Sequence, residues 1–217
     1  MPPKIMFVLD FDGVLVNSST LCLELLRRVH TEIGGTRPIP DDLWHRLDDI
    51  SFPAMARYLG VPAGQRAKYL RRIFERMVDE AYRPELFDGM DGVLRALARE
   101  GPIAILSASP AAVIEMALDR AGLSTCVAAI RDGRDPASKT AKLPGLLDQF
   151  GASPSQAVMV GDATSDIRAG RANGMRTAAV TWGWQGRDLL ATAEPDWIFT
   201  RVEALLTLPE RLRSQAS

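Results

Sequence analysis

The sequence predicts an α/β protein, a doubly wound parallel sheet that is interrupted by a block of helices. Short apolar runs without polar alternation recur along the chain, which is typical of strands buried on both faces. From about residue 89 onward, helical segments separate these runs, and this order indicates a parallel sheet. Between residues 18 and 84 the pattern is helical only.

The expected strands are six apolar runs, each bounded by turn or charged residues. They cover residues 4–10, 102–108, 126–132, 157–162, 176–182 and 196–200. The expected helices between the later runs cover residues 92–101, 110–122, 140–151 and 166–174. Each of these helical segments ends at a glycine, as helices often do. We therefore expect residues 1–17 and 85–217 to form the α/β core.

The helical block follows directly after the first expected strand. Helical patterns cover residues 18–33, 41–60 and 65–82, the second with a break near Ser51–Pro53. In the third segment, one apolar stripe lies opposite a basic face; the stripe is Ala67, Leu70, Phe74, Met77, Val78 and Ala81. We expect residues 18–84 to form a helical cap with hinges near 13–18 and 82–89. Both histidines, His30 and His45, are expected on helix surfaces of this cap.

Composition and charge limit the classes of protein that this chain can be. Apolar residues make up 47% of its 217 residues and charged residues 24%, which is ordinary for a globular protein. The net charge of -1 argues against a nucleic-acid or membrane-surface binder. The first apolar run is too short, and too soon broken by acid, for a signal peptide. With Cys22 and Cys126 expected as buried, reduced thiols, we expect a cytoplasmic protein.

Polar residues follow several of the expected strands at the point where each strand ends. Asp10 and Asp12 follow the first strand, Ser107 follows the second, and Asp162 follows the run at 157–161. Asp166 lies one helical turn after Asp162, and Lys139 and Lys142 precede that strand. Because ligands bind outside the carboxyl ends of strands in open parallel sheets, we expect these groups to converge on one crevice.

Convergent carboxylates repel one another unless a cation neutralises them. Mg²⁺ is the natural partner, because it prefers hard oxygen ligands and usually keeps waters and a phosphate oxygen. The lysine and the serine suit an anion. The sequence therefore predicts a site for Mg²⁺ and a phosphate group at the end of the first strand.

The same segments resemble the four motifs of the haloacid dehalogenase superfamily of phosphohydrolases, in the expected order. The matching segments are "DFDGVLVNS" (10–18), "ILSAS" (105–109), the region of Lys139, and "VGDATSDIRAGRANG" (160–174). The resemblance covers essentially the whole chain, because a helical insertion after the first strand is the cap of one large branch. The turn "TWGWQG" (181–186) is similar to turns in phosphoglycolate phosphatase-like members.

The resemblance implies a role for each motif residue. Asp10 would be the nucleophile, forming an aspartyl-phosphate, and Asp12 the general acid and base. Mg²⁺ would be held by Asp10, the backbone carbonyl of Asp12, and Asp162. Asp166 would orient a metal-bound water or the lysine.

The phosphate group is expected to contact the second and third motifs. Ser107, Ala108 and Lys139 would bind it, with Lys139 favoured over Lys142 although Thr140 follows it where many relatives have proline. Ser109 and Pro110 are expected to begin the next helix, with Ser109 as its N-cap. Free N–H groups there would point at the phosphate. In the cap, Ser51 and Phe52 are expected to influence substrate choice.

The interpretation that accounts for most of these features is a Mg²⁺-dependent phosphatase that acts on a small phosphorylated metabolite such as phosphoglycolate. Asp12 favours a phosphate ester over a haloacid, because a leaving alkoxide needs a proton and a halide does not. A sugar-phosphate mutase of the β-phosphoglucomutase type is an alternative, and it would release almost no phosphate. A receiver-type signalling domain is disfavoured, because its acceptor aspartate follows a central strand where this chain has "ILSAS". We expect no nucleic-acid or membrane partner.

Overall fold

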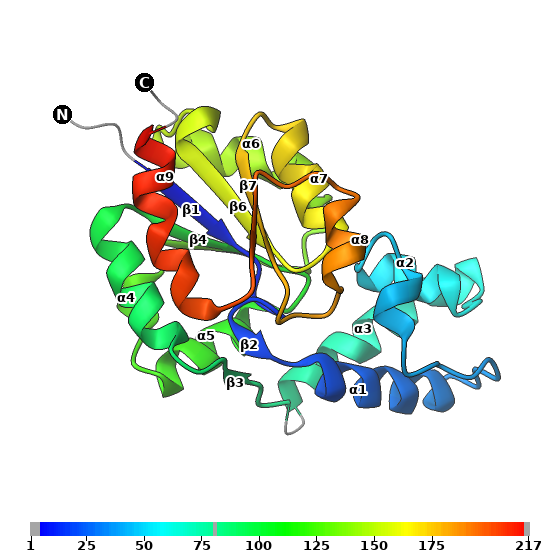
Figure 1. Ribbon diagram of the computed structural model, residues 1–217. Helices are drawn as coiled ribbons and strands as arrows, with labels where there is room; N and C mark the ends of the chain where they lie inside the picture. The colour runs from blue at the N-terminus through cyan, green and yellow to red at the C-terminus, as the bar shows by residue number, and fades with distance from the viewer. Residues whose placement is uncertain (1–4, 80–81, 215–217) are drawn as a thin grey trace.

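The computed structural model describes residues 5–79 and 82–214, and a six-stranded parallel sheet lies at its centre (Figure 1). The strands are β1 (Met6–Leu9), β4 (Ile103–Leu106), β5 (Ala129–Arg131), β6 (Ala157–Gly161), β7 (Arg176–Val180) and β8 (Trp197–Phe199). Their order in the sheet is β5-β4-β1-β6-β7-β8. Each strand lies within the apolar run that predicted it, so the α/β prediction with a doubly wound parallel sheet is confirmed.

The order of the strands reverses around β1, which pairs with β4 on one side and with β6 on the other. Where β1 pairs with β6, Leu9 lies opposite Val160, so the two strands end at nearly the same position along the edge of the sheet. The residues that follow them, Asp10 and Asp162, therefore emerge side by side. This point is where ligands bind in doubly wound sheets.

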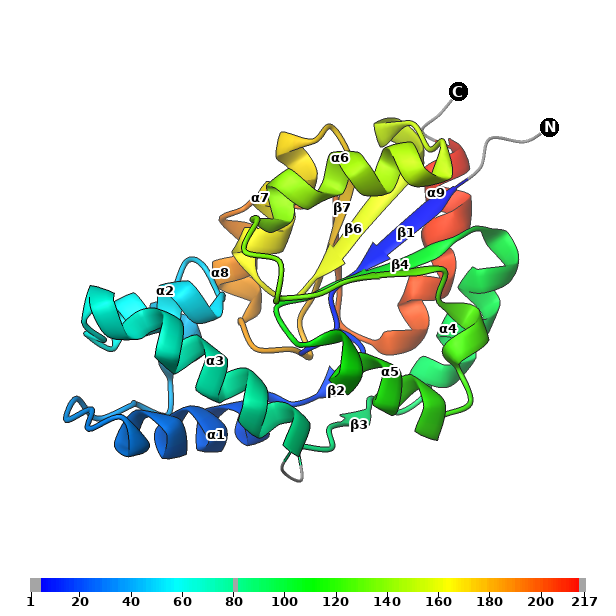
Figure 2. The ribbon, with the colours of Figure 1, turned by 180° about the vertical axis from the view of Figure 1, so that it is seen from behind.

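Helices cover both faces of the sheet, which explains why its strands lack polar alternation (Figures 1 and 2). The core helices are α4 (Met90–Glu100), α5 (Ala111–Arg120), α6 (Lys139–Phe150), α7 (Thr164–Ala172), α8 (Arg187–Ala191) and α9 (Leu208–Ser214). Short 3₁₀ turns lie at η2 (Ser124–Cys126), η3 (Pro154–Gln156) and η4 (Val202–Thr207). Phe7 and Leu9 of β1 share one buried cluster with α4 and α5, whereas Met6 and Val8 share another with α6.

The insertion after β1 is helical, as expected, and lies beyond the carboxyl end of the sheet (Figure 1). It contains α1 (Ser19–Glu32), the 3₁₀ turn η1 (Leu43–Arg46), α2 (Phe52–Tyr58) and α3 (Ala63–Asp79). A two-stranded antiparallel ribbon, β2 (Val16–Asn17) with β3 (Glu85–Leu86), joins its two connections to the core. Two-residue strands leave no periodic pattern, so the ribbon was not predicted. The domain limits of 1–17 with 85–217 and of 18–84 stay a prediction, because one buried cluster continues from the sheet into the insertion.

Two expectations about the insertion were wrong. The buried stripe of α3 is Tyr69, Ile73 and Met77, so of the predicted stripe only Met77 is fully buried among the described residues. Leu70, Phe74 and Val78 are half-buried, and Ala67 is exposed. The predicted stripe also included Ala81, which lies outside the described residues. His30 is not on the surface but buried at 5% exposure, with the edge of its ring against Tyr69. The α3 helix carries two adjacent apolar stripes, and only contact with α1 decides which one is buried.

Cys22 and Cys126 are both free thiols. Cys22 is buried as expected, whereas Cys126 is half-buried. Among the helices in the described part of the chain, none has the length and apolar character needed to cross a membrane.

Candidate active site

Asp10 stands at the end of β1 with its carboxylate held on both oxygens. Its Oδ1 accepts a 2.7 Å hydrogen bond from the backbone N–H of Phe11, and its Oδ2 lies 2.6 Å from Lys139 Nζ. The residue is 8% exposed. The strand end and the lysine together orient this carboxylate toward the crevice beside β6.

Asp162, at the end of β6, approaches the turn that follows Asp10. Its Oδ2 accepts a 2.7 Å hydrogen bond from the backbone N–H of Trp184. Gly13 lies so near that a Cβ atom built on it would be 1.9 Å from Asp162 Oδ2, and its φ is 73°. Only glycine adopts this conformation without strain and leaves this space, so the glycine of the first motif brings the two aspartates together.

Lys139 begins α6, where the Ser138 hydroxyl caps the helix by accepting from the N–H of Ala141. Its Nζ lies 2.6 Å from Asp10 Oδ2 and 2.6 Å from Asp166 Oδ1. The other candidate, Lys142, instead donates to the backbone carbonyls of Asp132 and Asp135. Of the two lysines, Lys139 is thus the one that reaches the carboxylates.

Three buried carboxylates meet in this crevice. Oxygens of Asp10, Asp162 and Asp166 lie within 4.8 Å of one another. Burial, together with the charges of Asp10 and Asp166, raises the pKa of Asp162 well above its ordinary value. Burial raises the pKa of Asp166 to about 6 although Lys139 opposes the shift. Burial alone would lower the pKa of Lys139, but the charges of Asp10 and Asp166 raise it.

This donor set fits a hard divalent cation. It offers only oxygen atoms, and its negative charge exceeds what the single ammonium group of Lys139 neutralises. The carboxylate of Asp166, expected beside the metal ligands, lies within the same 4.8 Å of the other two. The carboxylate of Asp12 belongs to a different set of contacts.

Asp12 is bound by two hydroxyl groups from distant parts of the chain. Tyr82 Oη donates to its Oδ1 at 3.0 Å, and Ser109 Oγ donates to its Oδ2 at 2.5 Å. Burial raises the pKa of Asp12 above its ordinary value, partly offset by the hydrogen bond from Ser109. A carboxyl group that holds a proton more readily than usual suits a general acid.

The expectation for Ser109 was wrong. Pro110 is the N-cap of α5, which begins at Ala111, and the Ser109 hydroxyl binds Asp12 instead. The first N–H of the helix, that of Ala111, donates to Asp132 rather than standing free. Ser107, which is 3% exposed, lies at the end of β4 and accepts from the N–H of Ser109.

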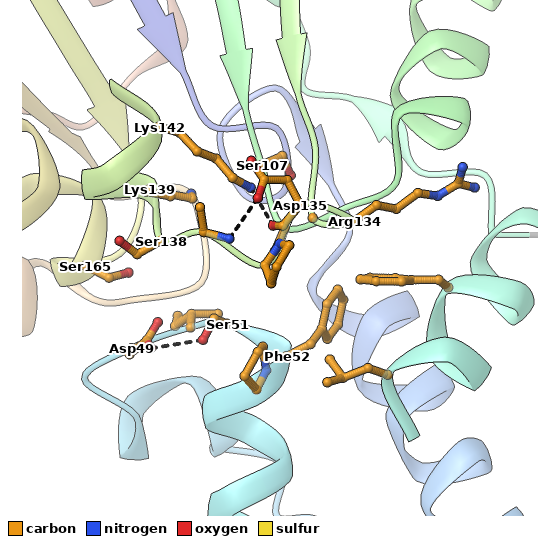
Figure 3. A pocket seen from close by; sticks show the side chains of 18 of the residues that line it. Asp49, Ser51, Phe52, Ser107, Arg134, Asp135, Ser138, Lys139, Lys142 and Ser165 are labelled. Carbon is orange, nitrogen blue, oxygen red and sulfur yellow. Dashed lines mark hydrogen bonds between the residues drawn. The ribbon is translucent and has the colours of Figure 1, made fainter. Parts of the chain in front are cut away.

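Two connected cavities lie in front of these residues. The first, of about 20 Å³, has room for one water-sized group and is lined by Asp10, Asp12, Ser107, Ala108, Lys139, Asp162, Asp166 and the cap residues Ile50, Phe52 and Met55. The second, of about 1000 Å³, opens between the core and the insertion (Figure 3). Phe52 lines both cavities. Ser51 lines only the larger one and donates to Asp49 at 2.9 Å.

The model of one protein family matches residues 5–180 of this chain, and its description is haloacid dehalogenase-like hydrolase. The chain belongs to this family. The matched span runs from β1 to β7 and so contains every strand end described above.

Relatives of this hydrolase include a phosphoglycolate phosphatase from Synechococcus elongatus. It is 31% identical over 209 residues, which cover 96% of this chain and 98% of the relative. A haloacid dehalogenase-like hydrolase structure from Streptococcus pneumoniae has a TM-score of 0.80 at 19% identity, covering 96% and 99% of the two chains. A candidate β-phosphoglucomutase from Bacteroides vulgatus has a TM-score of 0.77 at 16% identity, covering 99% and 90%. The hydrolase is thus an enzyme, a phosphoric monoester hydrolase.

Three residues that connect the site to the insertion were not predicted. Tyr82 reaches Asp12 across 70 positions of sequence. Gln185, in the hydrolase's "TWGWQG" turn, accepts from Thr164 N–H at 2.7 Å and donates to the carbonyl of Leu47 at 2.7 Å. Thr164 Oγ1 donates to the carbonyl of Asp48. A glutamine five residues after the end of β7 gives no signal by itself, but its place beside the two tryptophans of the turn could have drawn attention to it.

Proposed function

We propose that this hydrolase cleaves phosphate monoesters by covalent catalysis, with Asp10 as the nucleophile and Asp12 as the general acid and base. The observation that carries the proposal is the contrast between two carboxylates of one turn. Asp10 adjoins Lys139 and two further carboxylates, whereas Asp12 is buried between two hydroxyl groups with a raised pKa. Two neighbouring carboxylates that lie in different environments are typical of a site in which each carboxylate has its own catalytic role.

The reaction proceeds in two transfers. A carboxylate oxygen of Asp10 forms a bond to phosphorus while the bond from phosphorus to the ester oxygen breaks, and Asp12 gives its proton to the departing alkoxide. Water then attacks the aspartyl-phosphate, Asp12 takes a proton from this water, and inorganic phosphate leaves. Ser107, the backbone of Ala108 and Lys139 bind the phosphoryl oxygens and stabilise the charge that develops there.

Asp10, the backbone carbonyl of Asp12 and Asp162 would hold Mg²⁺, for which the buried oxygen-only donor set is suited. When bound, Mg²⁺ supplies positive charge that offsets the repulsion between the carboxylate nucleophile and the phosphate. Asp166 holds the ammonium group of Lys139 at 2.6 Å and so fixes its direction.

The substrate we propose is a small phosphorylated metabolite, with phosphoglycolate as the first candidate. Support comes from the Synechococcus relative, which matches this chain over nearly its whole length. The proposal includes a cytoplasmic location and no nucleic-acid or membrane partner, in keeping with a net charge of -1.

The experiment measures phosphate released from phosphoglycolate and a panel of sugar phosphates, with Mg²⁺ and after its removal by a chelator. A phosphatase releases stoichiometric phosphate from its substrate only with the metal present. A β-phosphoglucomutase-type enzyme interconverts hexose phosphates and releases almost none, which would contradict the proposal. Asp12→Asn should retain the fold and lose turnover of alkyl esters.

A further inference from the structure

The larger cavity has an apolar wall that the proposed chemistry leaves unused. Ile50 and Phe52 lie on the side of the insertion, and Leu70, Phe74 and Val78 of α3 continue this surface away from the catalytic residues. The rings of Phe52 and Phe74 meet edge to face, with centroids 5.7 Å apart. In Figure 3, Phe52 and Ser51 lie on one side of the cavity and Ser107, Ser138 and Lys139 on the other.

The α3 helix explains why this wall is apolar but only partly buried. One stripe, Tyr69, Ile73 and Met77, is fully buried inside the molecule. The adjacent stripe, Leu70, Phe74 and Val78, is half-buried and faces the cavity. Apolar surface that faces water is unfavourable, and a ligand that covers this stripe would remove it from water.

The side of the insertion that faces the small catalytic cavity is apolar. The insertion residues there are Ile50, Phe52 and Met55. Phe52 lines both cavities and contacts Phe74 of the α3 stripe, whereas charged residues such as Arg57 and Arg134 line other parts of the larger cavity. An alkoxide that leaves the phosphorus atom toward the insertion would therefore contact Phe52 and then the α3 stripe.

We propose that the larger cavity also admits phosphate monoesters of apolar alcohols of aromatic size, as a second substrate class beside small phosphorylated acids. The phosphoryl group would lie at Asp10 and the leaving group would pass Phe52 to contact Phe74, Leu70 and Val78. This inference rests on the proposed phosphatase function and adds a substrate class to it. Hydrolysis consumes one water and yields the alcohol and inorganic phosphate.

The test compares two alkyl esters whose alcohols have similar basicity, ethyl phosphate and 2-phenylethyl phosphate. We expect kcat/KM to favour the phenylethyl ester by about tenfold or more in the wild type, and Phe74→Ser to reduce this ratio to about one. The circular-dichroism spectrum and urea denaturation of Phe74→Ser, compared with those of the wild type, show that the variant is folded. A wild-type ratio near one, or an unchanged ratio in the variant, overturns the inference while leaving the phosphatase function intact. Absence of phosphate release from every ester overturns both.

A separate observation concerns Tyr82, whose hydroxyl lies 3.0 Å from Asp12 Oδ1. Tyr82 is 5% exposed and lies between α3 and β3, at the connection back to the core. Ser109 holds the other oxygen of Asp12.

We infer that Tyr82 is a positioning residue that directs the proton of Asp12 toward the leaving group. Removing the Tyr82 hydroxyl would let the carboxyl group of Asp12 rotate. The rate would then fall only for esters whose leaving group needs a proton. A merely structural role would affect all esters alike.

The test uses leaving groups of different basicity in Tyr82→Phe, with Tyr58→Phe as a matched control away from the site. For ethyl phosphate we expect kcat/KM to fall about tenfold, which corresponds to the loss of one hydrogen bond. For 4-nitrophenyl phosphate we expect little change in kcat/KM, because its leaving group needs no proton. We compare kcat/KM because this parameter depends on the transfer of the phosphoryl group to Asp10 and not on the later hydrolysis of the aspartyl-phosphate. An equal fall for both esters, or no fall for either, overturns the inference.

Discussion

Lys139 Nζ lies 2.6 Å from Asp10 Oδ2, although the lysine begins a helix whose N-terminus repels cations. The second contact, 2.6 Å to Asp166 Oδ1, supplies a further negative charge that compensates for this position. Two buried carboxylates therefore hold this ammonium group at the end of β1. In the proposed reaction the same ammonium group would also face the phosphoryl oxygens.

Lys139→Met should remove most of the turnover. The loss of a charge that stabilises the transferring oxygens is expected to lower kcat by about 100-fold or more. Steady-state phosphate release measures this, and Lys142→Met is the matched control because its ammonium group binds backbone carbonyls. A larger loss in Lys142→Met than in Lys139→Met would transfer the phosphate-site role to Lys142.

Gly13→Ala should lose activity beyond its effect on stability. Its φ of 73° costs a side chain about 1–2 kcal/mol, and its Cβ would displace Asp162. Gly34→Ala provides the control, because Gly34 has a φ of 78° and no atom within 4 Å of the added Cβ. Urea denaturation should show a larger loss of stability in Gly13→Ala than in Gly34→Ala, because the overlap with Asp162 adds to the strain of the positive φ. Phosphate release should fall only in Gly13→Ala. Full activity in Gly13→Ala would refute the close approach to Asp162.

Asp196→Asn should make stability less dependent on pH. Burial opposes ionisation of Asp196, but hydrogen bonds from Thr177 N–H and Oγ1, with the Arg176 ion pair, lower its pKa below the ordinary 3.8. A lowered folded-state pKa contributes stability above pH 3.8, and this contribution is lost as pH falls through the folded value.

The contacts of Asp196 connect the segment before β8 to β7. At pH 7 we expect Asp196→Asn to lower the free energy of unfolding by about 1–3 kcal/mol. Urea denaturation from pH 7 to pH 3 should show the difference from wild type narrowing below pH 3.8. A difference that stays constant over this range would show that the charge of Asp196 is not what stabilises the fold.

His30→Leu should stabilise the protein. The imidazole is buried, and within the described part of the chain neither ring nitrogen has a hydrogen-bond partner. An unsatisfied buried polar group costs about 1–3 kcal/mol, which an apolar side chain avoids. Thermal unfolding of His30→Leu is compared with that of His45→Leu, where the side chain is exposed and little change is expected. A lower melting temperature in His30→Leu would mean that water or another group satisfies the ring.

The sheet could be predicted from the sequence because all its strands are covered on both faces, which makes each one a continuous apolar run. Asp10, Asp12 and Asp162 could be singled out because they closely follow these runs, and Lys139 because its region resembles the third family motif. The side of α3 that is buried could not be predicted, because Tyr69 and Leu70 stand on adjacent stripes of similar apolar character. Tyr82 could not be found either, since its role depends on a contact across 70 positions.

The central claim is that Asp10 carries the phosphoryl group between the two transfers. Rapid quenching during turnover of a phosphate monoester, followed by mass spectrometry of peptides, tests it most directly. The account predicts one added phosphoryl group on the peptide that contains Asp10, and none in Asp10→Asn, which should remain folded and release no phosphate. A phosphoryl group on another residue, or undiminished turnover by Asp10→Asn, would contradict the account.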